Sequence, residues 1–264
     1  MAKEKGLLLA LDIGNTNVTV GVFDGEKLKA TWRIASGVHR MPDEYASVLL
    51  NLLPLEHIAV ASVREAVICS VVPSLEVTFI SLLERYFGIT PLVVGVGVKT
   101  GVKLATENPR EVGADRVVNA AAAQRLYGGP VIVIDFGTAT TFDAVSREGD
   151  YLGGAIAPGI DIAAEALFLR TAKLPQVELT RPKNAIGRNT VSAMQSGIIF
   201  GYIGLVEGIV ARIRQELGGE ARTVATGGYA EIIARETPVI EMVNPDLTLI
   251  GLRMIYDMNR ERKK

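Results

Sequence analysis

The chain has 264 residues, of which 48% are hydrophobic and 22% are charged, so it has enough apolar material for two medium domains and too many charges for a membrane protein. The net charge of −1 argues against nucleic acid as the main partner. The single cysteine, Cys69, excludes an intrachain disulfide and lies in an apolar run, where it is expected to be a small core residue. With no signal peptide and no membrane span in the pattern, we expect a cytoplasmic protein.

The first half is expected to begin with a strand meander and to continue with alternating helices and strands. Pro42 and Pro73 each fit the first turn of a helix, and Asp24-Gly25 fits a hairpin turn. A polar stretch then leads to an alanine-rich helix over residues 113–127. The expected strands cover residues 7–13, 18–23, 27–34, 66–72 and 92–96.

The second half follows the same plan. Strands are expected over residues 131–134, 135–145, 151–157 and 224–226, and helices from Pro158-Gly159 to Ala172, over 190–217, after Gly227-Gly228 and after Asn244-Pro245. The helix over 190–217 carries glycines on one face, where backbones can pack closely. An internal repeat of this size indicates duplicated domains, which we assign to residues 1–118 and 119–264.

Each half carries an acid at the end of an apolar strand, followed by glycine and small polar residues. The two copies are Asp12-Ile13-Gly14-Asn15-Thr16-Asn17 and Asp135-Phe136-Gly137-Thr138-Ala139-Thr140. Glycine lets the backbone approach a phosphate, N–H and hydroxyl groups donate to its oxygens, and a carboxylate holds a cation. The alternative for each acid is an Asx-turn that caps local N–H groups. The matched pair favours a clamp on one nucleotide, although neither copy is a Walker loop.

Two further motifs could carry chemistry. Gly113-Ala114-Asp115-Arg116 begins a helix, where an Asp can simply cap the helix. At the junction of the two halves, the same Asp could accept a proton from a substrate hydroxyl while the Arg orients an oxygen-rich substrate. Gly227-Gly228 is either a plain turn or a flat backbone surface for an adenine ring.

In this order, the motifs closely resemble type III pantothenate kinases, of the actin, sugar-kinase and Hsp70-like ATPase superfamily, over nearly the whole chain. The most specific marker is Asn108-Pro109-Arg110-Glu111-Val112-Gly113-Ala114-Asp115-Arg116, supported by Ser70-Val71-Val72-Pro73. The resemblance implies an α/β fold of two duplicated ribonuclease H-like domains, with mixed sheets flanked by helices. It also implies ATP-dependent phosphorylation of pantothenate to 4′-phosphopantothenate, the first step of coenzyme A synthesis.

The resemblance also implies roles for individual residues. Asp115 would accept the proton, Asp135 would hold a monovalent cation such as potassium or ammonium, and Asp12 would lie beside Mg²⁺. A homodimer is implied as well, without nucleic acid or membrane as partner. Many members have tyrosine at the position of Thr106, which puts that substrate contact in question. The ATP residues are Asp12, Ile13, Gly14, Asn15, Thr16, Asn17, Val18, Thr19 and Thr138, to which we add Gly227 and Gly228. The pantothenate residues are Thr106, Gly113, Ala114, Asp115, Arg116 and Thr190.

Two other readings stay open at this point. The Asp-Gly turns would also serve a sugar kinase or a polyphosphate-cleaving phosphatase of the same superfamily, although the string around Asp115 argues against these. A non-catalytic accessory factor for transcription is the second alternative. Formation of ADP only in the presence of pantothenate would separate the kinase from both.

Overall fold

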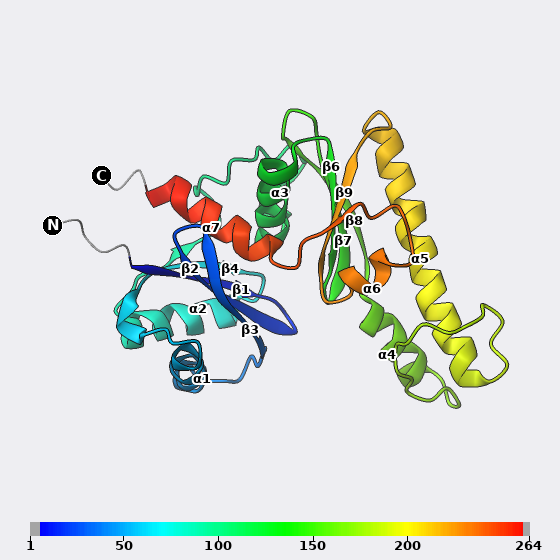
Figure 1. Cartoon of the computed structure of the whole chain (residues 1–264), viewed down its shortest axis with the longest axis horizontal. Coiled ribbons are helices and arrows are strands. Elements are labelled where there is room, and N and C mark those ends of the chain that lie inside the picture. Colours follow the sequence, from blue (N-terminus) through cyan, green and yellow to red (C-terminus); the bar gives the residue numbers. More distant parts are fainter. Residues whose placement is uncertain (1–5, 261–264) are drawn as a thin grey trace. The chain divides into compact units, whose positions relative to one another are not determined.

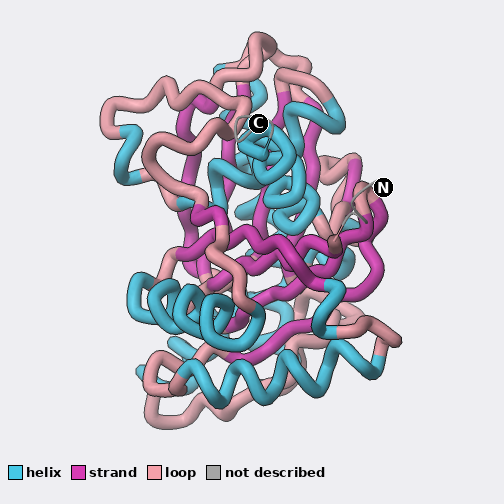
Figure 2. The backbone as a smooth tube through the Cα atoms, turned by 90° about the vertical axis from the view of Figure 1, so that its left-hand side faces the viewer, coloured by secondary structure: helices cyan, strands magenta, loops and turns pink. Residues whose placement is uncertain are grey.

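The computed structural model describes residues 6–260, which divide by their contacts into two compact units. The first comprises residues up to Val102, Asn108–Ala122 and the segment from Asp246 onward, and the second comprises Lys103–Glu107 and Ala123–Pro245. Figure 1 labels their helices and strands, and Figure 2 shows the strands in magenta and the helices in cyan.

The first unit contains a five-stranded mixed sheet in the order β3-β2-β1-β4-β5. Strand β1 pairs antiparallel with β2 and parallel with β4. Both faces of β1 are covered, so its sequence is a continuous apolar run rather than an alternating one. The strands are β1 (Leu7–Ile13), β2 (Asn17–Asp24), β3 (Lys27–Ala35), β4 (Val63–Ser70) and β5 (Leu92–Val93).

Two pairs of helices cover this sheet. Helices α1 (Pro42–Leu55) and α2 (Pro73–Leu82) pack on the face that carries the alternate β1 residues Leu9, Leu11 and Ile13. Helices α3 (Ala114–Tyr127) and α7 (Leu247–Arg260) pack on the face that carries Leu8 and Ala10. Asp12 shares this second face because side chains alternate along a strand. Short helical turns cover Val60–Ser62, Leu83–Phe87 and Pro109–Glu111.

The second unit contains a five-stranded sheet in the order β10-β9-β6-β7-β8. Read from the opposite edge, this is the order of the first sheet, with β6 to β10 in the places of β1 to β5. Helix α5 covers one face of this sheet, where its apolar side chains meet alternate residues of β6. The strands are β6 (Val131–Phe136), β7 (Ala139–Val145), β8 (Tyr151–Pro158), β9 (Arg222–Gly227) and β10 (Met242–Val243). The helices are α4 (Ile160–Arg170), α5 (Thr190–Glu216) and α6 (Ala230–Ala234).

The repeated strand order confirms the predicted fold class of two duplicated ribonuclease H-like domains. The units interleave along the chain, because α7 belongs by its contacts to the first unit. The sequence assigned α7 to residues 119–264, and that boundary stays a prediction.

One detail differs from expectation. The strand expected over residues 92–96 extends only over Leu92–Val93, because a turn begins at Gly95. On the expected glycine face of α5, a β-carbon at Gly197, Gly201 or Gly204 would meet nothing within 4 Å in the described part of the chain. Among the described residues, α5 is the one helix that is long and apolar enough to cross a membrane, and 39% of its most apolar stretch is buried.

Candidate functional site

In the first unit, the turn after β1 is an exposed loop on a rigid base. Ile13 and Val18 are fully buried in the core, so only their backbone groups can reach a ligand. The residues at the tip, Asn15 to Asn17, are exposed. The Gly14 N–H donates to the Asn17 carbonyl at 3.0 Å, which closes the turn. Such a turn presents backbone N–H and side-chain groups to an anion without burying them.

Ser36 in the segment after β3 fixes this turn from outside. Its hydroxyl donates to the Gly14 carbonyl at 2.7 Å, and its N–H donates to the Thr16 carbonyl at 2.9 Å. The turn is therefore held in place by the sheet edge.

Asp115 lies in the first turn of α3, with its Oδ1 accepting a hydrogen bond of 2.8 Å from the Arg116 N–H. Burial raises the pKa of this carboxyl above its ordinary value, and the hydrogen bond and the charge of Arg116 oppose that rise. A β-carbon at Gly113 would lie 2.5 Å from Oδ1, so the carboxylate occupies space that only glycine leaves open. A partly buried carboxylate with a raised pKa is suited to accepting a proton.

The first unit brings Asp12 and Asp115 together around Cys69. The pKa of the fully buried Cys69 thiol is raised, mainly by burial and then by the charges of Asp12, Asp115 and Glu76. Cys69 is directly opposite Asp12 in the parallel pairing of β1 and β4. Cys69 is thus the small core residue that the sequence predicted, and the neutral thiol is its stable form.

In the second unit, two glycines hold the turn after β6 from opposite sides. A β-carbon at Gly159 would lie 2.2 Å from the Thr138 carbonyl oxygen, and one at Gly227 would lie 2.6 Å from the Phe136 carbonyl oxygen. The Gly159 N–H donates to the Thr138 carbonyl and the Gly228 N–H donates to the Phe136 carbonyl, both at 3.1 Å. Gly227 also has a φ of 91°, which favours glycine. Gly227 and Gly228 therefore lie directly against the turn that contains Thr138.

A tyrosine that the sequence analysis did not single out connects the diglycine turn to α4. Tyr229 follows the diglycine and donates from its hydroxyl to Asp161, in the first turn of α4. Burial, followed by this hydrogen bond, raises the pKa of Tyr229 well above its ordinary value. The contact joins the Gly227–Gly228 turn to the start of α4. The sequence signal was only a tyrosine next to a predicted turn.

Thr106 lies beside β8 in the second unit. The Ala105 N–H donates to the Tyr151 carbonyl at 2.8 Å, and the Thr106 methyl group would be 3.8 Å from a β-carbon at Gly153. The Thr106 hydroxyl is buried and has no hydrogen-bond partner among the described residues. A side chain with an unused donor and acceptor at this position is consistent with a polar ligand.

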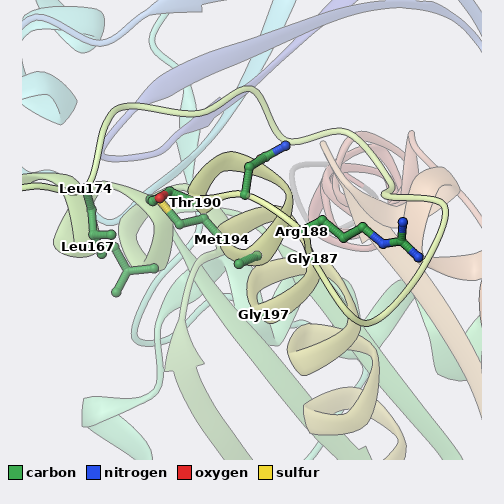
Figure 3. A pocket seen from close by; sticks show the side chains of 9 residues that line it. Leu167, Leu174, Gly187, Arg188, Thr190, Met194 and Gly197 are labelled. Atoms are coloured by element: carbon green, nitrogen blue, oxygen red, sulfur yellow. The ribbon is translucent and has the colours of Figure 1, made fainter.

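Thr190 is the first residue of α5, directly after the N-cap Asn189, whose side chain accepts from the Ser192 N–H at 2.8 Å. Thr190 lines a cavity of about 560 Å³ together with residues of α4, α5 and the segment that joins them. Figure 3 shows Leu167, Leu174 and Met194 near Thr190, whereas the Arg188 side chain extends away from them. The cavity is mainly apolar.

Among the described residues, no three His, Cys, Asp or Glu side chains gather to hold a metal ion. Any cation at Asp12 or Asp135 must therefore take most of its ligands from hydroxyl groups, the backbone, water or phosphate. Mg²⁺ bound with nucleotides has this donor set, in which one or two carboxylates join substrate phosphates.

The sequence comparisons decide the family. The profile of type III pantothenate kinases matches residues 8–212. A type III pantothenate kinase from Dehalococcoides mccartyi strain CBDB1 is 57% identical over 253 residues, covering 96% of both chains. The enzyme from Moorella thermoacetica is 53% identical over 253 residues, which cover 96% of this chain and 100% of the relative. The chain belongs to the type III pantothenate kinase family.

The solved structures show the same fold at low sequence identity. A Campylobacter jejuni structure described as a Baf family transcriptional activator has a TM-score of 0.62 and 18% identity, covering 96% of this chain and 99% of its own. The activator of 2-hydroxyisocaproyl-CoA dehydratase from Clostridium difficile, with bound ADPNP, has a TM-score of 0.52 and 13% identity, with 97% of both chains covered. These likenesses show that this family member shares the fold of both proteins.

Proposed function

We propose that this family member transfers the γ-phosphoryl group of ATP to the primary hydroxyl of pantothenate, with Asp115 as the proton acceptor. The reaction follows from membership of the type III pantothenate kinases, whose relatives match this chain over nearly its whole length. The observation that supports Asp115 is its partly buried carboxylate with a raised pKa at the start of α3. A base works best when its pKa approaches the working pH.

The first unit supplies the N–H and hydroxyl groups of residues 12–19, which bind the phosphates of ATP. It also supplies residues 113–116, which bind pantothenate. Asp12 is the proposed carboxylate beside Mg²⁺, which neutralises charge on the phosphate oxygens when bound. Support comes from the exposed, braced turn of residues 14–17 and from the carboxylate of Asp12 at its base.

The second unit supplies Thr138 to the phosphates, and Gly227 and Gly228 to the adenosine part of ATP. Asp135 is the proposed ligand of a monovalent cation, potassium or ammonium. Because neither the turn after β1 nor the turn after β6 contains a lysine, this cation would add positive charge beside the phosphates. Thr106 and Thr190 are the proposed further contacts to pantothenate. The unused hydroxyl of Thr106 and the lining position of Thr190 support them.

We also propose a homodimer built on α4 and α5, with nucleic acid and membrane playing no part and the cytoplasm as location. Large apolar side chains are exposed here, among them Leu169 at 64% and Val191 at 43%. The open glycine face of α5 offers a surface for close helix packing. Sedimentation should give twice the mass of the chain, and a monomer at micromolar concentration would refute the dimer.

The deciding assay measures ADP release by the purified protein with ATP, Mg²⁺ and KCl, with and without pantothenate. We expect ADP only when pantothenate is present, in equal amount to 4′-phosphopantothenate. ADP release with a sugar instead would indicate another kinase of the superfamily. No turnover with either would favour the accessory-factor alternative.

A further inference from the structure

Three oxygen-bearing side chains lie in a row across one face of the second sheet. Asp135 on β6 is directly opposite Thr141 on β7 and directly opposite Thr226 on β9. Residues next to them in sequence point to the other face: Ile134 and Phe136 pack against α5, and Thr140 contacts the α5 residue Tyr202 at 2.8 Å. Because side chains alternate along strands, all three row residues share the face away from α5, at neighbouring-strand spacing of about 5 Å.

Thr226 places a hydroxyl at this position on the strand that runs parallel to β6. The residue is only 2% exposed. Because it is directly opposite Asp135 and shares its face of the sheet, its oxygen can reach an ion that the Asp135 carboxylate binds.

Thr141 is turned by a buried acid. Its hydroxyl donates to Asp143 Oδ2 at 3.2 Å, and Asp143, which is 0% exposed, also accepts from the Tyr151 hydroxyl at 2.8 Å. Because the Thr141 proton is directed toward Asp143, the oxygen keeps its lone pairs for a cation. Asp143 and Tyr151 thus orient Thr141 without reaching the cation themselves.

The duplicated first sheet provides an internal comparison. In the equivalent row, Asp12 is opposite Thr19 on β2 and opposite Cys69 on β4. The position of Thr226 is therefore taken by a thiol, which is neutral and buried. Hard cations prefer oxygen ligands to sulfur, so the two rows differ in one ligand although their backbones correspond.

We propose that Thr226 and Thr141 complete the monovalent-cation site at Asp135, and that the exchange of a hydroxyl for the Cys69 thiol decides which of the two duplicated acids binds that cation. This inference rests on the proposed role of Asp135. It adds two hydroxyl ligands and one orienting acid, and it explains why one row of the duplicated pair would bind potassium.

The test measures binding of radioactive Rb⁺, a potassium substitute, by equilibrium dialysis at constant ionic strength with choline chloride, with ADP and Mg²⁺ present. Wild-type protein should bind Rb⁺ in competition with KCl, and Asp135→Asn should not. Thr226→Val and Thr141→Val should each weaken binding by about 10-fold or more. Thr226→Ser, which keeps the hydroxyl, should bind like wild type, and Thr226→Cys, which copies the first row, should bind like the valine variant.

Folding is monitored without potassium by circular dichroism melting, and the serine and cysteine variants serve where valine does not fold. The inference would be overturned if Thr226→Cys and Thr141→Val bound Rb⁺ with wild-type affinity while Asp135→Asn lost Rb⁺ binding. That result would leave the proposed Asp135 site intact. Unchanged binding in Asp135→Asn, or no binding by wild type, would overturn the proposed site and the inference together.

Discussion

Replacement of Asp115 by asparagine tests the proposed base while preserving its surroundings. The asparagine side chain has the same shape, so it fits beside Gly113, where a β-carbon would be 2.5 Å from the carboxylate oxygen. Its amide oxygen can still accept the hydrogen bond that the Arg116 N–H now gives at 2.8 Å. The substitution therefore removes the proton acceptor and little else.

The expected loss in kcat is about 10²–10⁴-fold, the usual contribution of a positioned general base. This corresponds to about 3–5 kcal/mol of transition-state stabilisation. The KM for ATP should change little, because the proposed ATP contacts lie in the turns after β1 and β6 and after β9. A loss shared by kcat and kcat/KM indicates an interaction made in the transition state.

Stability should change in the opposite direction to activity. Burial raises the pKa of Asp115 in the folded protein, so the folded state carries an unfavourable charge once pH exceeds that raised pKa. The stabilising contribution of the protonated carboxyl is complete below the pKa of the unfolded chain and is lost as pH rises through the folded value. Asp115→Asn should therefore raise the melting temperature at neutral pH, and the difference should shrink toward acid pH.

The assay couples ADP release to NADH oxidation from pH 5 to 8, with calorimetric melting of both proteins in the same buffers. Wild-type kcat/KM should fall on the acid side as Asp115 becomes protonated, and the variant should lose this limb. Near-normal turnover by Asp115→Asn would refute the assignment of the base. A melting temperature of Asp115→Asn below that of the wild type at neutral pH would refute the inference that burial makes the Asp115 charge unfavourable.

Three other predictions follow from close contacts. Gly159→Ala should reduce kcat/KM for ATP strongly, because its β-carbon would lie 2.2 Å from the Thr138 carbonyl oxygen; Gly95→Ala, at a position after β5 where a β-carbon would meet nothing within 4 Å, is the control. Tyr229→Phe should raise the KM for ATP more than that for pantothenate, and Asp161→Asn, which still accepts the hydrogen bond, should do so less than Asp161→Ala. Cys69 should react with Ellman's reagent only after unfolding, and fast labelling of native protein would contradict its burial.

The sequence could predict the parts of this protein that depend on local pattern. Apolar strands that end in an acid and glycine, and helices that begin at Pro42 and Pro73, have causes within a few residues. The repeat predicts that the two halves share one plan, and both sheets do have the same strand order. The short length of β5 was not predicted, because residues 92–96 form an apolar run, whereas pairing with β4 covers only Leu92 and Val93 and a turn begins at Gly95.

Contacts between distant segments could not be predicted from the sequence. Tyr229 and Asp161 are far apart in the chain, and neither belongs to a motif. The sequence predicted Gly159 only as part of the Pro158-Gly159 start of a helix, whereas the structure shows that its missing side chain leaves room for the Thr138 carbonyl. Pairings of this kind depend on which strands become neighbours, and a single sequence records that only indirectly.

The row of Thr141, Asp135 and Thr226 gives a physical reason for the two duplicated acids to have different roles. Both acids end a strand at the same place in the same strand order, so backbone geometry cannot distinguish them. The neighbouring parallel strand supplies a hydroxyl oxygen in one unit and the thiol of Cys69 in the other. An oxygen-poor row suits a cation that takes its remaining ligands from phosphate and water, as Mg²⁺ does. An oxygen-rich row suits a larger monovalent cation held by the protein itself. A single residue on β9 can therefore separate the functions of the two halves after duplication.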